Sequence, residues 1–192
     1  MGYMDPKKLS PAARIAFKMI EFDENERLVT EIRKHPVGLL FIYIGGTIIT
    51  LTLVAIALVT AALMQSESAD IASIGPAIIA FGIVLAVFSL IITTIEAYLY
   101  RSNVILVTTE KISQLVYHSL FNRKISQLSI GDVQDVTVRQ EGIIAHIFNY
   151  GTLVIETAGE QQNYNFTFVP DPYKASKSIV GSHEENLKQY GN

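Results

Sequence analysis

Two long stretches of the chain, residues 37–64 and 71–95, are apolar almost without interruption, and neither contains a charged side chain. An α-helix rises about 1.5 Å per residue, so either stretch would form a helix longer than the roughly 30 Å hydrocarbon core of a bilayer. The first stretch begins too far from the N-terminus, and is too long, to be a cleaved signal peptide. The pattern therefore predicts two membrane-spanning helices.

The short connector at residues 65–70 makes the two predicted helices antiparallel neighbours in a hairpin. Arg33 and Lys34 precede the first helix and Arg101 follows the second, whereas the connector carries two acids and no base. Lys and Arg accumulate on the cytoplasmic side of membrane proteins, which predicts a multi-pass protein of the cell inner (plasma) membrane with both termini in the cytoplasm. The absence of cysteine agrees with a reducing compartment.

Beyond Arg101 the pattern changes to short runs of apolar and β-branched residues separated by turn residues, which is typical of β-strands. Six strands are expected, at residues 103–108, 111–117, 123–128, 133–139, 153–157 and 164–169. Residues 99–192 are therefore expected to form a cytoplasmic β-rich domain that follows the membrane hairpin of residues 37–98.

Two helical segments interrupt or end this β-rich pattern. Residues 141–149 place Ile143, Ile144 and Phe148 at helical spacing, which predicts a short helix whose apolar face belongs to the core. Residues 173–190 are expected to form a final helix that is broken or bent at Gly181.

The pentapeptide KISQL occurs twice, at residues 111–115 and 124–128. If the two copies form an antiparallel hairpin with its tip centred on Leu120, apolar residues face apolar ones and polar residues face polar ones in four pairs: Ile112 with Leu128, Leu115 with Ile125, Ser113 with Gln127, and Gln114 with Ser126. Such cross-strand pairs contribute a few tenths to about 1 kcal/mol each, and a slip of one residue would mismatch all of them. The repeat therefore predicts a hairpin rather than a duplicated ligand site.

Residues 1–36 are expected to be a separate cytoplasmic helical segment. Ser10 and Pro11 favour a helix start, and the residues that follow form an amphipathic, basic helix. Two positions are open for this helix, the anionic inner leaflet of the membrane or the surface of the soluble domain. Residues 21–35 are expected to form a second, charged helix, which Pro36 ends.

Several segments of the chain resemble the bacterial pleckstrin-homology-like domain, a membrane-flanked family. They are VTTEKI (107–112), SIGDVQDV (129–136) and IFNYGTLVI (147–155), together with EIRKHP (31–36), which resembles the family's lead-in to an apolar hairpin. The resemblance implies a strongly bent antiparallel β-barrel that is closed by a C-terminal helix and has one strand more than the six above. The expected fold class is thus an α+β membrane protein, with a two-helix transmembrane hairpin followed by this barrel. The seventh strand is expected within residues 99–108 or after Gly131. The resemblance does not identify a biochemical activity, because the family's own function is poorly defined.

No spacing of side chains indicates catalysis or metal binding. The four histidines lack the spacing of metal ligands, and the chain has no nucleophile elbow, phosphate-binding glycine-rich loop or dinucleotide fingerprint. We therefore expect no catalytic residue, no metal site, no cofactor and no enzymatic activity. Residues 99–192 carry eight bases and nine acids, which disfavours nucleic acid as a partner. Glu96, near the cytoplasmic end of the second apolar stretch, leaves a role in transport open.

Of the two non-enzymatic functions that remain, the first is a scaffold or assembly module at the inner membrane. It would act through protein–protein contacts with a second copy of the chain or with another membrane protein. Leu120 and Phe121 are apolar at a predicted turn, so they either contact such a partner or pack back on the domain.

The alternative function is the binding of anionic lipid headgroups by basic side chains. Three of these bases belong to the β-rich domain and three flank the membrane helices, namely Lys111, Arg123 and Lys124, and Arg101, Arg33 and Lys34. Each base near an anionic surface contributes about 1 kcal/mol, so these residues could hold the domain against the leaflet without selecting a lipid. The simpler explanation for the bases of the domain is that they are solvated strand ends.

Overall fold

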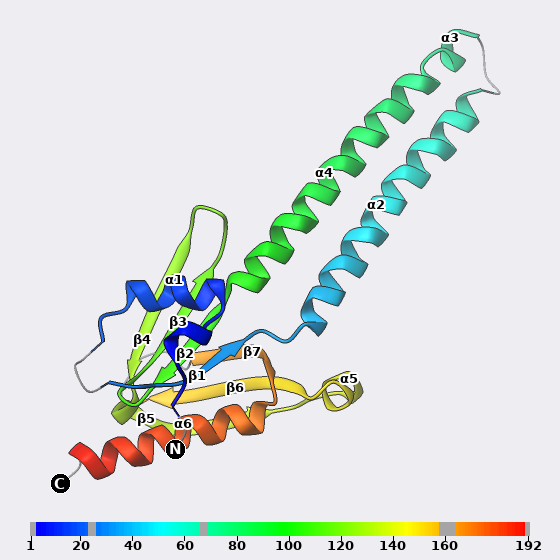
Figure 1. Ribbon diagram of the computed structural model, residues 1–192. Helices are drawn as coiled ribbons and strands as arrows, with labels where there is room; N and C mark the ends of the chain where they lie inside the picture. The colour runs from blue at the N-terminus through cyan, green and yellow to red at the C-terminus, as the bar shows by residue number, and fades with distance from the viewer. Residues whose placement is uncertain (1–2, 23–25, 66–68, 158–163, 191–192) are drawn as a thin grey trace. The chain divides into compact units, whose positions relative to one another are not determined.

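The computed structural model describes residues 3–22, 26–65, 69–157 and 164–190 (Figure 1). The chain divides into two compact units. Residues 39–98 form one of them, which we call the helical hairpin, and residues 1–38 together with 99–192 form the other, which we call the sheet unit. The N-terminal residues therefore belong to the same unit as the residues that follow the hairpin, and the expectation of a separate N-terminal helical segment is wrong.

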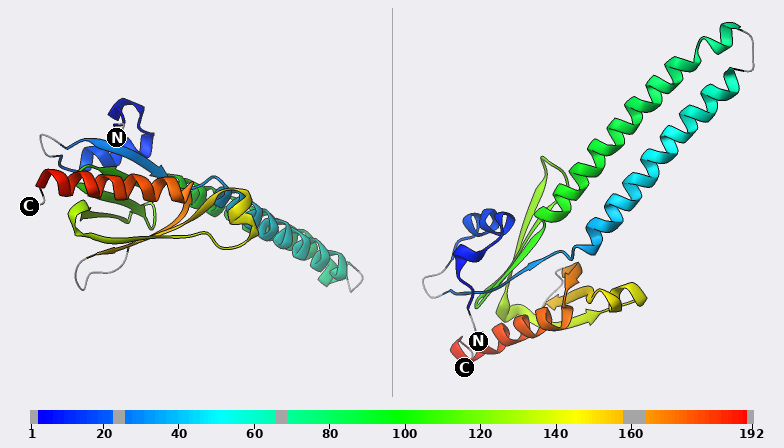
Figure 2. Two further views of the ribbon diagram at one scale, coloured as in Figure 1. Left: turned by 90° about the horizontal axis from the view of Figure 1, so that it is seen from below. Right: turned by 45° about the vertical axis from the view of Figure 1, so that its right-hand side comes forward.

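The helical hairpin is built from two long helices, α2 (Val37–Met64) and α4 (Gly75–Ser102), with the short helix α3 (Ala69–Ala72) before α4. Helix α2 has the predicted bounds, whereas α4 begins later than predicted and continues beyond residue 95, so that Glu96 is helical. Residues 66–68 of the predicted connector lie outside the described residues. Both long helices are long and apolar enough to cross a membrane, and they run side by side in Figure 1 and in the right-hand view of Figure 2.

Small residues allow α2 and α4 to approach each other closely. A Cβ atom added to Gly82 would overlap the side chain of Ala57 on the opposite helix. The hydroxyl oxygens of Thr50 and Ser89 lie 3.1 Å apart across the same interface. Close backbone approach and interhelical hydrogen bonds of this kind hold apolar helices together where the surroundings are as apolar as the side chains.

The first sheet of the sheet unit contains four antiparallel strands in chain order, β1 (Leu28–Arg33), β2 (Val104–Thr108), β3 (Lys111–Tyr117) and β4 (Arg123–Ser129). Strands β2, β3 and β4 agree with the predicted strands to within one residue at each end. Strand β1 is the seventh strand, so the prediction of a charged helix at residues 21–35 is wrong. The seventh strand also lies outside both regions in which it was expected.

Strand β1 pairs with the edge of β2 that β3 leaves unpaired. All five residues of β2 are buried, so their backbone groups need hydrogen-bonding partners on both sides. Ile32 pairs with Ile105, and the side chains of Leu28 and Val29 are buried as well. The strand and its partner are separated in sequence by the whole helical hairpin, which is why a local pattern of charged residues did not reveal the pairing.

The β3–β4 hairpin has the predicted register. Ile112 pairs with Leu128 and Leu115 pairs with Ile125, so apolar side chains face each other across the hairpin. The polar residues between them are matched in the same way. The structural explanation of the KISQL repeat is confirmed.

The second sheet contains β5 (Val133–Arg139), β6 (Tyr150–Thr157) and β7 (Tyr164–Pro170) in that order. The 3-10 turn η2 (Ile130–Asp132) joins β4 to β5, and helix α5 (Ile143–Ile147) lies between β5 and β6. The described strands form two separate sheets of four and three strands, so the expectation of a closed barrel is wrong.

The two sheets meet at the end of β7, where the backbone N–H of His35 donates to the carbonyl of Phe168 (2.6 Å). Phe168 has a φ of +57°, which is unusual for an aromatic residue, and the pairing of β6 with β7 is irregular between Gly151 and Leu153. A bulge of this kind bends a strand and interrupts its ladder. Strand β7 therefore contacts β1 without extending the first sheet.

Helix α6 (Pro172–Tyr190) packs against strands of both sheets (Figure 2). It continues without a break through Gly181, so the predicted interruption is wrong. Ile179 and Ser182 are buried, and His183 Nδ1 lies 2.7 Å from the carbonyl oxygen of Ile130. This packing outweighs the roughly 1 kcal/mol that a glycine costs inside a helix.

The sheet unit has two apolar cores. The main core lies between the sheets and α6 and includes Val107, Ile112, Ile130, Leu153, Ile155 and Ile179. The second core lies on the outer face of the first sheet, where helix α1 (Pro11–Met19) and its flanking residue Leu9 pack on Leu106 and Leu115. Helix α1 therefore occupies the second of its two expected positions, the surface of the domain.

Helix α5 exposes its apolar side chains. Ile143 and Ile147 are 79% and 70% exposed, Ile144 and Phe148 are also exposed, and Ala145 is the buried residue of the helix. The prediction that this apolar face belongs to the core is wrong. Helical periodicity identified the face correctly, but α5 lies at the end of the β5–β6 hairpin, beyond the strands that enclose the core.

Candidate functional site

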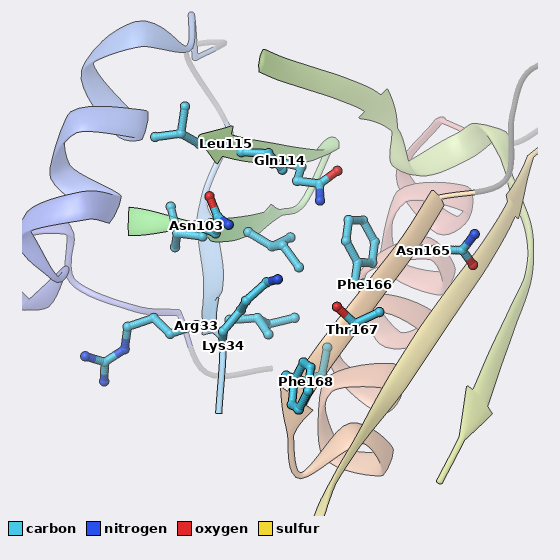
Figure 3. Close-up of a pocket in the computed structure, with 14 residues that line it drawn as sticks. Arg33, Lys34, Asn103, Gln114, Leu115, Asn165, Phe166, Thr167 and Phe168 are labelled. Atoms are coloured by element: carbon cyan, nitrogen blue, oxygen red, sulfur yellow. The ribbon is translucent and has the colours of Figure 1, made fainter. Parts of the chain in front are cut away.

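A cavity of about 180 Å³ lies between the two sheets of the sheet unit (Figure 3). Residues of β1, β2, β3 and β7 line it, together with Lys34 and Asn103. Lys34 comes three residues before the start of α2 and Asn103 directly follows α4. The cavity is therefore at the end of the sheet unit from which the chain leaves for the helical hairpin and to which it returns. In Figure 3 the side chains of Lys34 and Phe166 point into this space, whereas Arg33 points away from it.

Lys34 is the cation of this cavity. Its ammonium nitrogen lies 5.1 Å from the centroid of the Tyr100 ring, which is within the range of a cation–π interaction. Burial lowers the pKa of Lys34, because a charged ammonium loses hydration there. Among the described residues no carboxylate forms an ion pair with it, and the polar side chains of Gln114 and Thr167 line the same cavity. The cavity is thus suited to an anionic group.

An aromatic cluster borders the cavity and holds the two chain connections together. The Tyr100 hydroxyl donates to the carbonyl of His35 (2.8 Å). The rings of Tyr100 and Phe168 are in an edge-to-face arrangement with their centroids 6.0 Å apart. The Tyr150 ring stacks on the Phe168 ring with a centroid distance of 5.3 Å, and its centroid lies 5.5 Å from that of the His35 ring. Burial lowers the pKa of His35, and a hydrogen bond to the backbone of Phe148 opposes this shift. The residues before α2 and at the end of α4 are therefore neighbours within the sheet unit.

Lys111 is held in an internal ion pair. Its ammonium nitrogen lies 3.0 Å from Glu26 Oε2 and donates to the carbonyl of Glu21 (2.7 Å), and the side chain is 18% exposed. The carboxylate of Glu26 is fully buried and also accepts a hydrogen bond from Thr108. The signal that could have revealed this role is the run of acids at residues 21–26 in the sequence, of which Glu26 pairs with Lys111 once β1 joins the sheet.

The structure does not bring the three predicted bases of the domain together. Lys111 pairs with Ser129 at one end of the β3–β4 hairpin, whereas Arg123 and Lys124 are exposed at the other end. Strands of seven residues separate these ends by about 20 Å at 3.4 Å per residue. Lys124 pairs with Val116, which lines the cavity, so Lys124 is on the face of the sheet that carries the cavity.

The bases beside the long helices have different surroundings. Arg33 lies 3.5 Å from the Glu31 carboxylate and its side chain is largely exposed. Arg101 is exposed in the last turn of α4. Lipid contact by Arg101, Arg123 and Lys124 stays a prediction.

The tip of the β3–β4 hairpin is apolar and exposed. Phe121 is 98% exposed and Leu120 is also exposed, so the alternative in which they pack back on the domain is wrong. The hydroxyl oxygen of Ser119 accepts from the backbone N–H groups of Phe121 (3.3 Å) and Asn122 (3.0 Å), which holds the turn. Strand β4 ends its sheet, and none of the described strands pairs with its outer edge. We call β4 together with Leu120 and Phe121 the docking edge.

Glu96 lines an apolar groove on the helical hairpin, together with Ser89 and Thr93. Among the described residues that line this groove, Glu96 is the only one with an ionisable side chain. A proton relay would need a second titratable group within reach, so the groove gives no support to a role in transport.

Sequence reasoning identified Lys34 as a base near the membrane but missed the cavity around it. The aromatic partners Tyr100, Tyr150 and Phe168 come from three separate segments, and only the fold brings them together. The one available signal was the position of Tyr100 close to Arg101, at the end of the second apolar stretch.

Comparison with known proteins gives one family and one similar structure. A family model described as "Bacterial PH domain" matches residues 37–179, which include the helical hairpin and most of the sheet unit. The chain is similar to the crystal structure of a DUF1696 family protein with a pleckstrin-homology domain from Shewanella loihica PV-4. That similarity has 14% identity and a TM-score of 0.34, and it covers 42% of this chain and 70% of that one. No curated protein matches the chain.

Proposed function

Since this chain belongs to the bacterial PH domain family, we propose that it is anchored in the cell inner membrane by α2 and α4 and serves there as a scaffold or assembly module. Both termini are cytoplasmic in this proposal, and the chain acts by binding rather than by catalysis. The length and apolar character of the two helices support the anchor. The bases Arg33, Lys34 and Arg101 beside their ends support the orientation.

The observation that carries the protein-binding function is the docking edge. An unpaired edge strand offers a row of backbone N–H and C=O groups to which an extended segment can add as a further strand. Phe121, almost fully exposed beside this edge, offers an apolar anchor of the kind that is enriched at protein interfaces. We therefore propose that a second copy of the chain, or another membrane protein, docks on β4 and on the tip formed by Leu120 and Phe121.

A photoreactive amino acid at position 121 of the full chain, in native membranes, is expected to give one cross-linked product of discrete mass. Lys177 is exposed on α6 and serves as the matched control position, at which no discrete product is expected. Gel electrophoresis and mass spectrometry identify the product as a homodimer or as a complex with a second protein. A chain that stays monomeric, or equal products at both positions, would contradict the assembly function.

The double substitution Leu120→Ser with Phe121→Ser is expected to abolish that product when the photoreactive group is moved to position 118, which is exposed and leaves Ser119 in place. Because both side chains are exposed, the free energy of unfolding should change by no more than about 0.5 kcal/mol. Thermal unfolding of the purified variant therefore separates a lost contact from a lost fold. Retention of the product in the folded double variant would exclude the hairpin tip as the contact.

The second candidate function, binding of an anionic lipid headgroup, is favoured by Lys34 in the cavity. The Lys34 ammonium is half-buried and has an aromatic ring and polar side chains around it. A bound anion would therefore stabilise it more than it would stabilise a fully hydrated surface lysine. Lys111 is held by Glu26 and is not available for this role. Lys34 is therefore the residue through which a phosphate-bearing headgroup would be bound, with Gln114 and Thr167 as polar neighbours.

Lys34→Gln is expected to weaken binding of a short-chain phosphatidylglycerol to the detergent-solubilised full chain by about fivefold, the equivalent of about 1 kcal/mol for one base. Because burial lowers the pKa of Lys34, the wild-type affinity should fall as pH rises, at lower pH than for an exposed lysine. Titration calorimetry over a range of pH measures both effects, with Lys177→Gln as the control. Equal binding of inorganic phosphate would indicate an anion site without lipid recognition, and no binding of either titrant would exclude this function.

A further inference from the structure

We propose that helix α5 is a membrane-insertion element, whose apolar side chains lie in the interfacial region of the bilayer in which α2 and α4 are anchored. The inference rests on the proposed membrane anchor and is independent of the docking edge. We call Ile143, Ile144, Ile147 and Phe148 the apolar knob. These four large side chains are exposed on one short segment, whereas the cores of the sheet unit are complete without them.

The position of the knob relative to the bilayer follows from the chain itself. The ring of His35 is hydrogen-bonded to the backbone of Phe148, and Val37 is the first residue of α2. His35 Nδ1 accepts from the backbone N–H of Val37 (3.1 Å), so one imidazole ring and two hydrogen bonds separate the two backbones, and the end of the knob lies within about 10 Å of the residue at which the apolar span begins. This distance holds for any orientation of the sheet unit relative to the helical hairpin.

The chain that returns from α4 lies at the same end of the sheet unit as the chain that enters α2. The Tyr100 hydroxyl donates to the carbonyl of His35, and Tyr100 belongs to the last turns of α4. If both helices span the bilayer, the chain leaves it and enters it at neighbouring points, and Phe148 is next to them. The headgroup region extends roughly 5–8 Å beyond the hydrocarbon on each side, which is the depth that a short apolar segment at this place can occupy.

The backbone of the knob is suited to a lipid environment. The N–H groups of His146 and Phe148 donate to the carbonyls of Gly142 (3.3 Å) and Ile144 (3.0 Å), and the amide of Gln140 donates to the carbonyl of Ala145 (2.9 Å). Backbone groups that are paired within the segment can leave water at little cost. The docking edge is different, because an unpaired strand edge would carry its backbone groups into lipid without partners.

The charges of the segment agree with this assignment. Between Gly142 and Asn149 the sequence contains a single ionisable side chain, that of His146. Its Nδ1 lies 2.9 Å from the carbonyl oxygen of Gly142. Ala145 faces the sheet unit, and the four residues of the knob face outward. An apolar face of this kind, with no charged residue to desolvate, partitions into the interface rather than remaining in water.

The test uses the absence of cysteine in the chain, which makes every single-cysteine variant unambiguous. Full-length protein with Ile143→Cys or Ile147→Cys is labelled with an environment-sensitive fluorophore and reconstituted in vesicles of phosphatidylethanolamine and phosphatidylglycerol. Leu58→Cys, exposed in the second half of α2, reports the anchor, and Lys177→Cys, exposed on α6, reports the aqueous phase. Brominated lipids quench a probe in the bilayer, and iodide quenches a probe in water.

Probes at positions 143 and 147 are expected to show blue-shifted emission, quenching by brominated lipid and protection from iodide, whereas the probe at 177 shows the reverse. Quenching by lipid at position 58 together with quenching by iodide at 143 and 147 would overturn the inference and leave the anchor intact. Protection of 143 and 147 from both quenchers would also overturn it, because a protein would then cover the knob. Loss of lipid quenching at position 58 would refute the membrane anchor itself, and with it the insertion of α5.

Discussion

A fragment that contains only residues 99–192 is expected to remain unfolded, whereas residues 1–38 joined by a short linker to residues 99–192 are expected to fold cooperatively. The fragment lacks β1, so one edge of the buried strand β2 has no partner. It also lacks α1 and Leu9, which cover the outer face of the first sheet. The missing part is therefore an integral layer of the domain rather than a leader to it.

The expected loss is comparable to the whole stability of such a domain. Five large apolar side chains would be missing from the two cores, namely Leu9, Ile20, Leu28, Val29 and Ile32. Each fully buried side chain of this size contributes about 1.5–3 kcal/mol, so their sum is about 8–15 kcal/mol. Domains of this size have a free energy of unfolding of about 5–15 kcal/mol.

Circular dichroism and thermal unfolding of the two proteins measure the difference. A short linker suffices in the joined protein, because Gly38 and Tyr100 are in contact and a side chain at position 38 would overlap the Tyr100 ring. A sharp unfolding transition of residues 99–192 alone would contradict the assignment of β1 and α1 to the domain. The same measurement decides which part of the chain is suitable for binding experiments in solution.

Lys111→Met is expected to lower the free energy of unfolding of the sheet unit by about 3–5 kcal/mol, because it leaves a buried carboxylate without its cation. The Lys111 ammonium lies 3.0 Å from a carboxylate oxygen of Glu26, whose side chain is fully buried. Thr108 donates to the same carboxylate but cannot compensate its charge. The substitution therefore tests whether this lysine is structural rather than a ligand for lipid.

The repeat provides the matched control for this substitution. Lys124 begins the second copy of KISQL as Lys111 begins the first, but it is exposed. Lys124→Met should change the free energy of unfolding by no more than about 0.5 kcal/mol. Urea unfolding of both variants gives the comparison, and Lys111→Met combined with Glu26→Gln should recover part of the loss. Equal effects at the two lysines would show that the ion pair contributes no stability.

Two exposed apolar elements of the sheet unit are assigned to different environments. The tip of the β3–β4 hairpin continues into an unpaired strand edge, which a protein segment can satisfy and lipid cannot. In helix α5 and its C-terminal cap, the N–H groups of His146 and Phe148 are paired within the segment, and His35 connects this segment with the start of α2. The cross-linking and quenching experiments test these assignments separately, because each uses its own positions.

The parts of this protein that follow from local periodicity could be predicted from its sequence. Uninterrupted apolar stretches determined the two long helices, and alternation determined β3 and β5 to the residue. The register of the β3–β4 hairpin was also determined, because KISQL is complementary to itself in one antiparallel alignment. These features depend on residues that are close in sequence, so a single chain contains the information directly.

Only the tertiary structure decided the features that depend on a distant partner. Strand β1 looked like a charged helix because its partner β2 lies beyond the helical hairpin. The periodicity of α5 marked an apolar face but could not say whether the fold would cover it. The two lysines of the repeat have the same four residues after them, yet one is paired with Glu26 and the other is exposed. Their roles differ because burial and charge pairing are set by neighbours in space, which the local sequence does not contain.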